Sequence, residues 1–84
     1  MMIKVKFFSP IREIIKKGEE EIEIKEDFTV KDLLDELAVK YGNPFRQIPF
    51  IILVNDRGIN QMGGEKVRLK EGDLVTFLPM LSGG

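Results

Sequence analysis

Apolar and polar residues alternate at the start of the chain. Ile3, Val5 and Phe7 are separated by single lysines, which gives the two-residue period of a strand that buries one face. The pattern therefore predicts a strand over residues 2–8.

A second alternation follows within twenty residues. Ile22 and Ile24 stand between charged residues over positions 21–25, which predicts a second strand. Its acidic face can lie beside Lys4 and Lys6, because opposite charges on neighbouring strands attract each other. The two strands are thus expected to form a ribbon.

A short helical turn is predicted between these strands. Ser9 is a suitable N-cap, and Pro10 is tolerated at the first helical position because its missing N–H costs nothing there. The expected apolar face of this turn comprises Ile11, Ile14 and Ile15.

The longest amphipathic segment predicts a helix over residues 30–41. Thr29 and Asp32 have the spacing of a capping box, with Asp in place of Glu, and Gly42 provides the end of the helix. The apolar positions at helical spacing are Val30, Leu33, Leu34, Leu37 and Tyr41.

Two further strands and several turns are predicted in the second half. The continuous apolar run 50–54 indicates a strand covered on both faces, so its parity stays open, and 55–58 is a turn. Residues 67–69 are expected to form a short strand. The last strand is expected over 74–78, and Pro79 ends it.

The element order is strand, strand, helix, strand, short strand, strand. One long helix can cover one face of a mixed five-stranded sheet, which is an α+β fold. The first and last strands can lie parallel, because the intervening chain is long enough for a crossover. We expect one domain over residues 1–79 and a flexible tail over 80–84.

The amino-acid composition excludes several kinds of site and partner. The 84 residues contain no Cys and no His, so disulfides, thiolate metal sites and a histidine base are excluded. The net charge of −1 offers no attraction to nucleic acid. No apolar run is long enough for a membrane span, and the first residues lack a secretory signal, so a cytoplasmic location is expected. We predict no catalytic side chain and no bound metal, and whether the chain counts as an enzyme stays open.

The last five residues are the most informative segment for function. Extended, they reach about 15–18 Å, which is enough to enter a partner's active site while the domain docks outside. Gly83 and Gly84 lack a Cβ atom, so their backbone can pass a narrow channel and approach a nucleotide closely. The alternative interpretation is a frayed terminus that ends in two glycines by chance.

Several local strings, taken in order, resemble the small subunit of molybdopterin synthase and the thiamine-biosynthesis sulfur carrier. The resemblance spans the whole chain. The chain departs from the family pattern at Pro79-Met80, where the family often has a Pro-Pro pair, and around residues 61–64, where its hairpin is longer. The strings are Phe7-Phe8, Ile11 to Ile14, Thr29-Val30, Leu33-Leu34, Leu37-Ala38, Val54-Asn55, Leu69 to Asp73 with Val75, and Ser82-Gly83-Gly84.

The resemblance implies a ubiquitin-like β-grasp fold and a role as a sulfur carrier. An adenylating enzyme of the ubiquitin-activating type would use ATP on the Gly84 carboxylate, and a sulfur donor would then convert it to a thiocarboxylate. Ser82 and Gly83 would form the rest of the reactive tail. The large subunit of molybdopterin synthase would grip it, and no cofactor would be bound by this chain.

An apolar collar at the base of the tail is the expected partner surface. It comprises Leu78, Met80 and Leu81, and Phe8 or one parity of the 50–54 run can extend it across the uncovered sheet face, although Phe8 and these strand residues are more often ordinary core. The sulfur acceptor stays open between molybdopterin, a tungsten pterin, thiamine and transfer RNA. Two alternatives remain: a ubiquitin-like modifier joined to lysines, and a passive β-grasp module that binds protein.

Overall fold

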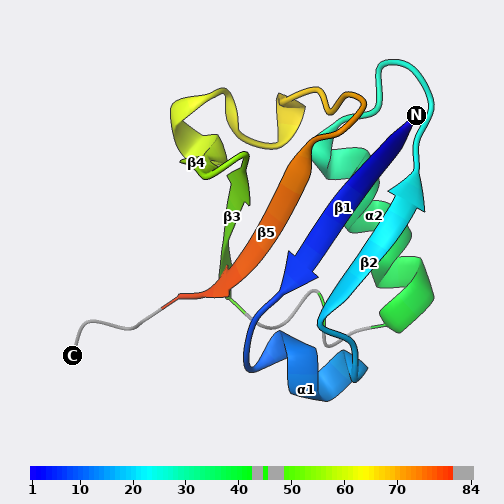
Figure 1. Cartoon of the computed structure of the whole chain (residues 1–84). Helices are drawn as coiled ribbons and strands as arrows, with labels where there is room; N and C mark the ends of the chain where they lie inside the picture. The colour runs from blue at the N-terminus through cyan, green and yellow to red at the C-terminus, as the bar shows by residue number, and fades with distance from the viewer. Residues whose placement is uncertain (43–44, 46–48, 81–84) are drawn as a thin grey trace.

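A mixed five-stranded sheet forms one layer of the protein (Figure 1). The structure is a computed structural model that describes residues 1–42, 45 and 49–80. The strands lie in the order β2-β1-β5-β3-β4. Their bounds are β1 Met2–Phe7, β2 Glu19–Glu23, β3 Phe50–Val54, β4 Arg57–Gly58 and β5 Leu74–Pro79.

The first and last strands pair at the centre of the sheet. β1 and β5 are parallel, with Val5 opposite Val75 and Phe7 opposite Phe77, as the sequence predicted. β1 also pairs with β2 in antiparallel fashion and places Lys4 opposite Glu21. The predicted ribbon of opposite charges is therefore confirmed.

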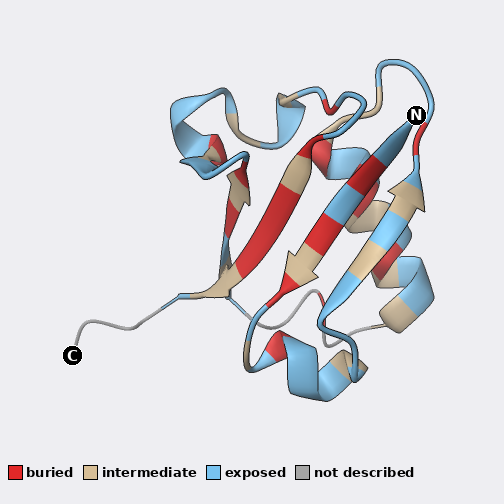
Figure 2. Ribbon diagram, in the orientation of Figure 1, coloured by how far each residue is buried: buried red, intermediate tan, exposed pale blue. Residues whose placement is uncertain are grey.

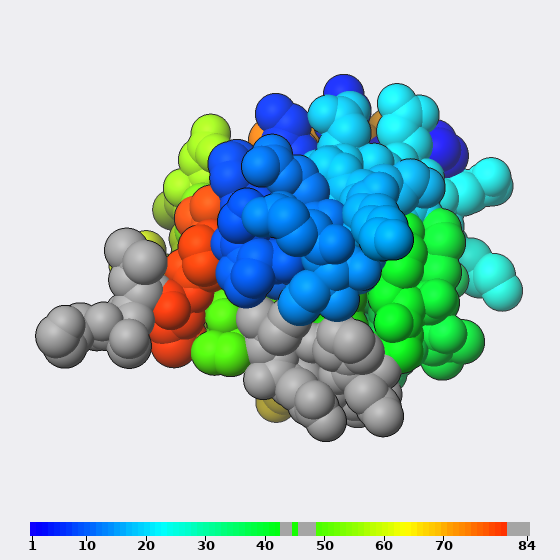
Figure 3. Space-filling model, turned by 90° about the horizontal axis from the view of Figure 1, so that it is seen from below, coloured from blue at the N-terminus to red at the C-terminus, as the bar shows by residue number. Residues whose placement is uncertain are grey.

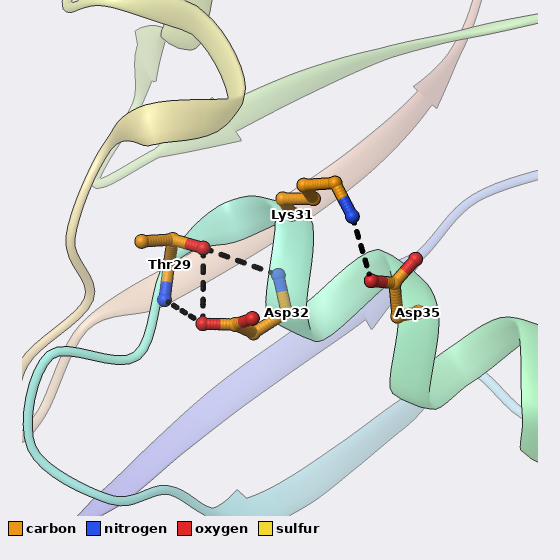
Figure 4. A network of polar contacts seen from close by, with 4 residues as sticks. All are labelled: Thr29, Lys31, Asp32 and Asp35. Atoms are coloured by element: carbon orange, nitrogen blue, oxygen red, sulfur yellow. Dashed lines mark hydrogen bonds and ion pairs between the residues drawn. The ribbon is translucent and has the colours of Figure 1, made fainter.

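The long helix α2, Val30–Tyr41, begins at the predicted capping box (Figure 4). The Thr29 backbone N–H donates to the Asp32 carboxylate over 2.9 Å, and the Asp32 N–H donates to the Thr29 hydroxyl over 3.2 Å. The backbone bond from Thr29, followed by its side-chain bond, lowers the pKa of the Asp32 carboxyl. One turn further on, Lys31 donates to Asp35 over 3.0 Å.

α2 covers one face of the sheet, and the core lies between the two layers (Figure 2). Alternate residues of β1 and β5 supply the sheet side of this core, and Val30, Leu33 and Leu37 supply the helix side. The other sheet face has no helix over it among the described residues (Figure 1).

The short helix α1, Ile11–Ile15, begins one residue later than the sequence indicated. Pro10 is the N-cap and makes no side-chain cap. The Ser9 hydroxyl instead donates to the Glu13 carboxylate, because Ser and Glu four residues apart meet across one turn. Of the three isoleucines expected on one apolar face, Ile11 is buried and Ile15 packs against the core, whereas Ile14 is 46% exposed.

The predicted short strand at 67–69 was also wrong. Arg68 makes only an isolated bridge with Thr29, and the fifth strand of the sheet is β4. β4 forms because Asn55 and Asp56 both adopt positive φ angles, 51° and 68°, which turn the chain back on β3. Two 3₁₀ turns, η1 Ile59–Gln61 and η2 Gly64–Lys66, then lead toward β5.

A polar network around the buried Asp73 joins the β3–β4 turn to the start of β5. The Asp73 residue is only 4% exposed, and its carboxylate accepts the Lys70 backbone N–H and an amide N–H of Asn55, both over 2.9 Å. The Asn55 carbonyl oxygen in turn accepts the Leu74 N–H over 2.9 Å. Satisfied in this way, Asp73 fixes where the last strand enters the sheet.

A second polar cluster ties β2 to the end of α2. Glu20 accepts hydrogen bonds from Lys40 and from the Tyr41 hydroxyl, and Lys17 lies 4.0 Å away. Burial acts to raise the pKa of Glu20, but the two hydrogen bonds and the charges of Lys40 and Lys17 prevail and lower it.

Acid should therefore weaken the fold partly through Glu20. A carboxyl with a lowered folded pKa adds stability above its ordinary value of 4.5, and that stability is lost as the pH falls through the folded value. We expect Glu20→Gln to flatten the decline in unfolding free energy between about pH 6 and about pH 3, measured by urea titration. Glu36→Gln, at an exposed carboxylate of α2, is the matched control, and an equal flattening by both variants would contradict the assignment.

Candidate functional site

An apolar patch lies at the end of the sheet where β5 finishes. Phe8, Leu78 and Ile51 stand in one row across the face that α2 leaves open, because Ile51 pairs with Leu78 and Phe8 continues the β1–β5 register. The Phe8 N–H donates to the Phe77 carbonyl over 3.1 Å, which holds Phe8 beside β5. We call Phe8, Ile51, Leu78 and Met80 the exit patch.

The members of the exit patch are apolar and largely accessible. Phe8 is 44% exposed, Ile51 42% and Met80 53%, and Leu78 is half-buried. The space-filling view shows the end of β5, in red and orange, against the blue segment that follows β1 (Figure 3). Phe8, Leu78 and Ile51, which are distant in sequence, thus lie side by side on one face of the sheet.

The parity of the 50–54 run, open in the sequence, is settled by the structure. Ile52 and Val54 are buried under α2, whereas Ile51 points to the open face. Phe50 packs against the core, with its ring centroid 5.0 Å from that of Phe77. Ile51 is therefore the residue of this run that extends the patch on the open face; the sequence left the parity open, since a fully apolar run carries no alternation.

The β2 side of the same sheet face is charged. Lys4 and Glu19 lie 3.6 Å apart there, and Glu21 and Glu23 stand nearby on β2. The open face thus passes from a solvated ribbon to an apolar patch toward the end of β5. A partner that buries apolar surface on this face would bind at the patch.

Met80 continues the chain from β5 toward the predicted tail. Its backbone N–H donates to the Pro49 carbonyl over 3.4 Å, and its side chain lines a groove of about 1000 Å³ beside the outer edge of β3. The structure thus places Phe8 beside Leu78, with Met80 two residues further along the chain; their role as a partner surface stays a prediction. Leu81, Ser82, Gly83 and Gly84 lie outside the described residues.

The four side chains of the exit patch are apolar and carry no acid, base or nucleophile. Among the described residues, the groups whose pKa is shifted lie outside the patch. Over residues 1–42, 45 and 49–80, no three acidic side chains gather where they could hold a metal ion. In the same part of the chain, no helix has the length and hydropathy of a membrane span.

Comparison with known proteins finds relatives over the whole length. A "Molybdopterin synthase sulfur carrier subunit" from Drosophila yakuba is 32% identical over 83 residues, which cover 98% of this chain and 90% of that protein. Among solved structures, a putative molybdopterin converting factor subunit 1 from Pyrococcus furiosus is 28% identical, with a TM-score of 0.82 over 96% of this chain and 99% of that one.

Two further structures bear on function. Subunit 1 of the molybdopterin-converting factor from Helicobacter pylori was solved in complex with subunit 2; the match is 30% identical, has a TM-score of 0.71 and covers both chains fully. Small archaeal modifier protein 1 from Methanosarcina acetivorans is 28% identical, with a TM-score of 0.78 over 99% of this chain and 96% of that one.

The sheet, its one long helix and these neighbours define a ubiquitin-like β-grasp protein. The predicted fold class is confirmed. The model of the ThiS family matches residues 5–84, and the chain belongs to that family of sulfur carriers.

Proposed function

We propose that this protein is the sulfur carrier subunit of a molybdopterin synthase and is activated at the Gly84 carboxylate. The observation that carries the proposal is the position of the exit patch, which lies where the chain leaves β5 for the tail. Support comes from the family match, which extends through residue 84, and from relatives that bear that name.

The chemistry asks little of the carrier's side chains. A carboxylate is a poor electrophile, so a partner enzyme would first join it to AMP and release pyrophosphate from ATP. Sulfur from a persulfide donor would then attack the acyl carbon and displace AMP, and a thiol would cleave the remaining S–S bond to leave the thiocarboxylate. The carrier contributes a reactive end and a docking surface.

The exit patch is suited to hold that end in place. A partner that buries Phe8 and Ile51 beside Leu78 is anchored at the base of the tail, so five extended residues would reach about 15–18 Å into its active site. The Helicobacter pylori complex supports a synthase large subunit as one such partner. The proposed function also requires an adenylating enzyme and a sulfur donor as partners.

Mass spectrometry of the protein purified from its native cell tests the function. A sulfur carrier should be found partly as a species heavier by the exchange of one oxygen for sulfur, located at Gly84 by fragmentation. Treatment with a thiol-alkylating reagent should shift that species only. If every molecule carries an ordinary carboxylate in cells that contain the adenylating enzyme and the synthase, the proposal fails.

Charge placed in the exit patch should prevent docking. Phe8→Glu and Ile51→Glu each put a carboxylate on the buried interface, and an unpaired buried charge is strongly unfavourable. We expect binding to the synthase large subunit, followed by calorimetry, to fall by at least about tenfold. Val39→Glu, a like change at an exposed apolar residue of α2, should bind as the wild type does.

The small archaeal modifier neighbour favours one second candidate, attachment of Gly84 to lysine amines of other proteins. Both functions use the same activated carboxylate and differ in the nucleophile that attacks it. Abundant isopeptide adducts of Gly84, in the absence of any thiocarboxylate, would select the modifier.

A further inference from the structure

A groove runs between the outer edge of β2 and the exposed side of α2. Its volume is about 720 Å³, and all residues that the structure assigns to its lining belong to these two elements, apart from Phe28 between them. β2 lies at the edge of the sheet, with α2 behind it (Figure 1). The groove is separate from the exit patch, because it opens on the α2 side at the β2 edge, whereas Phe8, Ile51 and Leu78 lie on the open face of the sheet.

The edge of β2 presents unpaired backbone groups to this groove. At the two ends of the ribbon, the Ile24 N–H donates to the Met1 carbonyl and the Phe7 N–H donates to the Gly18 carbonyl. In an antiparallel pair the bonded residues alternate, so the peptide groups of Glu19, Glu21 and Glu23 point away from β1. No described residue forms a backbone bond with them, and they can pair with an added strand.

The floor of the groove is apolar. Ile22 and Phe28 are half-buried, and Leu37 closes the floor from the helix. Val39 stands on the α2 side and is 87% exposed, the highest value among the large exposed hydrophobic residues of the described chain. In an extended segment laid against β2, every second residue would face α2, and one of these residues would cover the Val39 side chain.

The rim of the groove is acidic. Glu21, Glu23 and Glu36 form no ion pair with a described residue. Lys40, the only cation in the described lining, is already bound to Glu20. The uncompensated charge is therefore negative, and it favours a cationic occupant.

The same charge disfavours a second copy of this chain. Two β2 strands paired edge to edge would set glutamates against glutamates, and like charges on opposed strands are destabilising. Such charges also protect sheet edges from self-association. A basic strand is not repelled by these glutamates and can pair with β2.

We propose that this groove binds an extended basic segment of a partner protein, which adds to β2 as an outer strand. Its backbone bonds the outward peptide groups of Glu21 and Glu23, its alternate apolar residues cover Ile22 and Val39, and its Lys or Arg residues face the glutamates. This second docking surface is independent of the tail chemistry and leaves the exit patch free.

Titration of the full chain with a probe peptide tests the proposal. The probe is a capped seven-residue peptide that alternates Lys or Arg with Val or Ile, and it is followed by ¹H–¹⁵N NMR. We expect the largest shifts at the amides of Glu19, Glu21 and Glu23 and at Val39, and weaker binding as salt is added. A peptide of the same pattern with Glu in place of the basic residues should not bind.

Two variants at one position separate backbone pairing from charge. Glu21→Pro removes an N–H that points away from β1, and proline is tolerated in this way on edge strands, so the fold is kept and binding is lost. Glu21→Gln keeps the N–H and removes one charge, which should weaken binding by about two- to fivefold. Glu65→Gln, on η2, is the control and should change nothing. Thermal melting confirms that each variant is folded.

Four outcomes would overturn the proposal. They are an absence of shifts at millimolar peptide, shifts that do not gather along β2, equal binding of the acidic peptide, and unchanged binding by Glu21→Pro. An absence of shifts would mean that the glutamates only protect the edge of β2 from self-association. A dimer of this chain in sedimentation velocity that Glu21→Pro dissolves would assign the groove to a second copy instead.

Discussion

Removal of Gly83 and Gly84 should abolish adenylation and leave the fold intact. Every buried hydrophobic residue of the described chain lies between Ile3 and Phe77, so the deletion takes nothing from that core. It removes the carboxylate on which the proposed chemistry acts. We expect ATP–pyrophosphate exchange with the cognate adenylating enzyme to fall to background, while the melting temperature stays that of the full chain.

Two further proteins sharpen this experiment. The full chain with a C-terminal amide, made by semisynthesis, keeps both glycines and lacks the carboxylate; it should also be inactive. Val39→Asp, remote from the exit patch, should support exchange as the wild type does. Exchange by the truncated chain would remove the diglycine from the mechanism, and exchange by the amide would remove the carboxylate.

Leu37→Ala should produce the largest loss of stability among the changes considered. Leu37 is 1% exposed and belongs to the core cluster between α2 and the sheet. Truncation removes apolar contacts and leaves a cavity, which together cost about 2–5 kcal/mol. Urea unfolding monitored by circular dichroism measures the difference in unfolding free energy.

Val39→Ala is the matched control two residues further along α2. The side chain is 87% exposed, so its truncation should change stability by no more than about 0.5 kcal/mol. Equal losses at the two positions would mean that the buried face of the helix lies elsewhere.

The sequence predicted those elements correctly that bury one face and expose the other to solvent, because their apolar residues recur with a regular period. Ile3, Val5 and Phe7 alternate with lysines and form β1 as expected. The spacing from Val30 to Leu37, with the Thr29–Asp32 box before it, located α2 with its observed bounds. In both cases burial and local capping favour the same structure.

The sequence failed where local signals are weak or compete. β4 has two residues and no period, so its place in the sheet follows from the turn at Asn55 and Asp56 rather than from a pattern. The start of α1 was misplaced because the Ser9 hydroxyl bonds the Glu13 side chain in place of a backbone N–H.

The candidate site was predictable only in part. Phe8, Leu78 and Met80 flank the end of the last strand, and their apolar character at the base of the tail drew attention to them. Ile51 joins them through the register of β3 against β5, which depends on tertiary pairing. A uniformly apolar run such as 50–54 contains no information about which side chain faces the solvent.

The central position of β5 also governs when the protein can fold during its synthesis. β5 separates β1 from β3 in the sheet, yet it is the last of the five strands to be made. Until the ribosome releases it, β1 and β3 have no common neighbour, and their pairing must bridge most of the chain. We expect folding to wait until β5 has left the ribosome, so a nascent chain that stalls before β5 would display open strand edges and no exit patch.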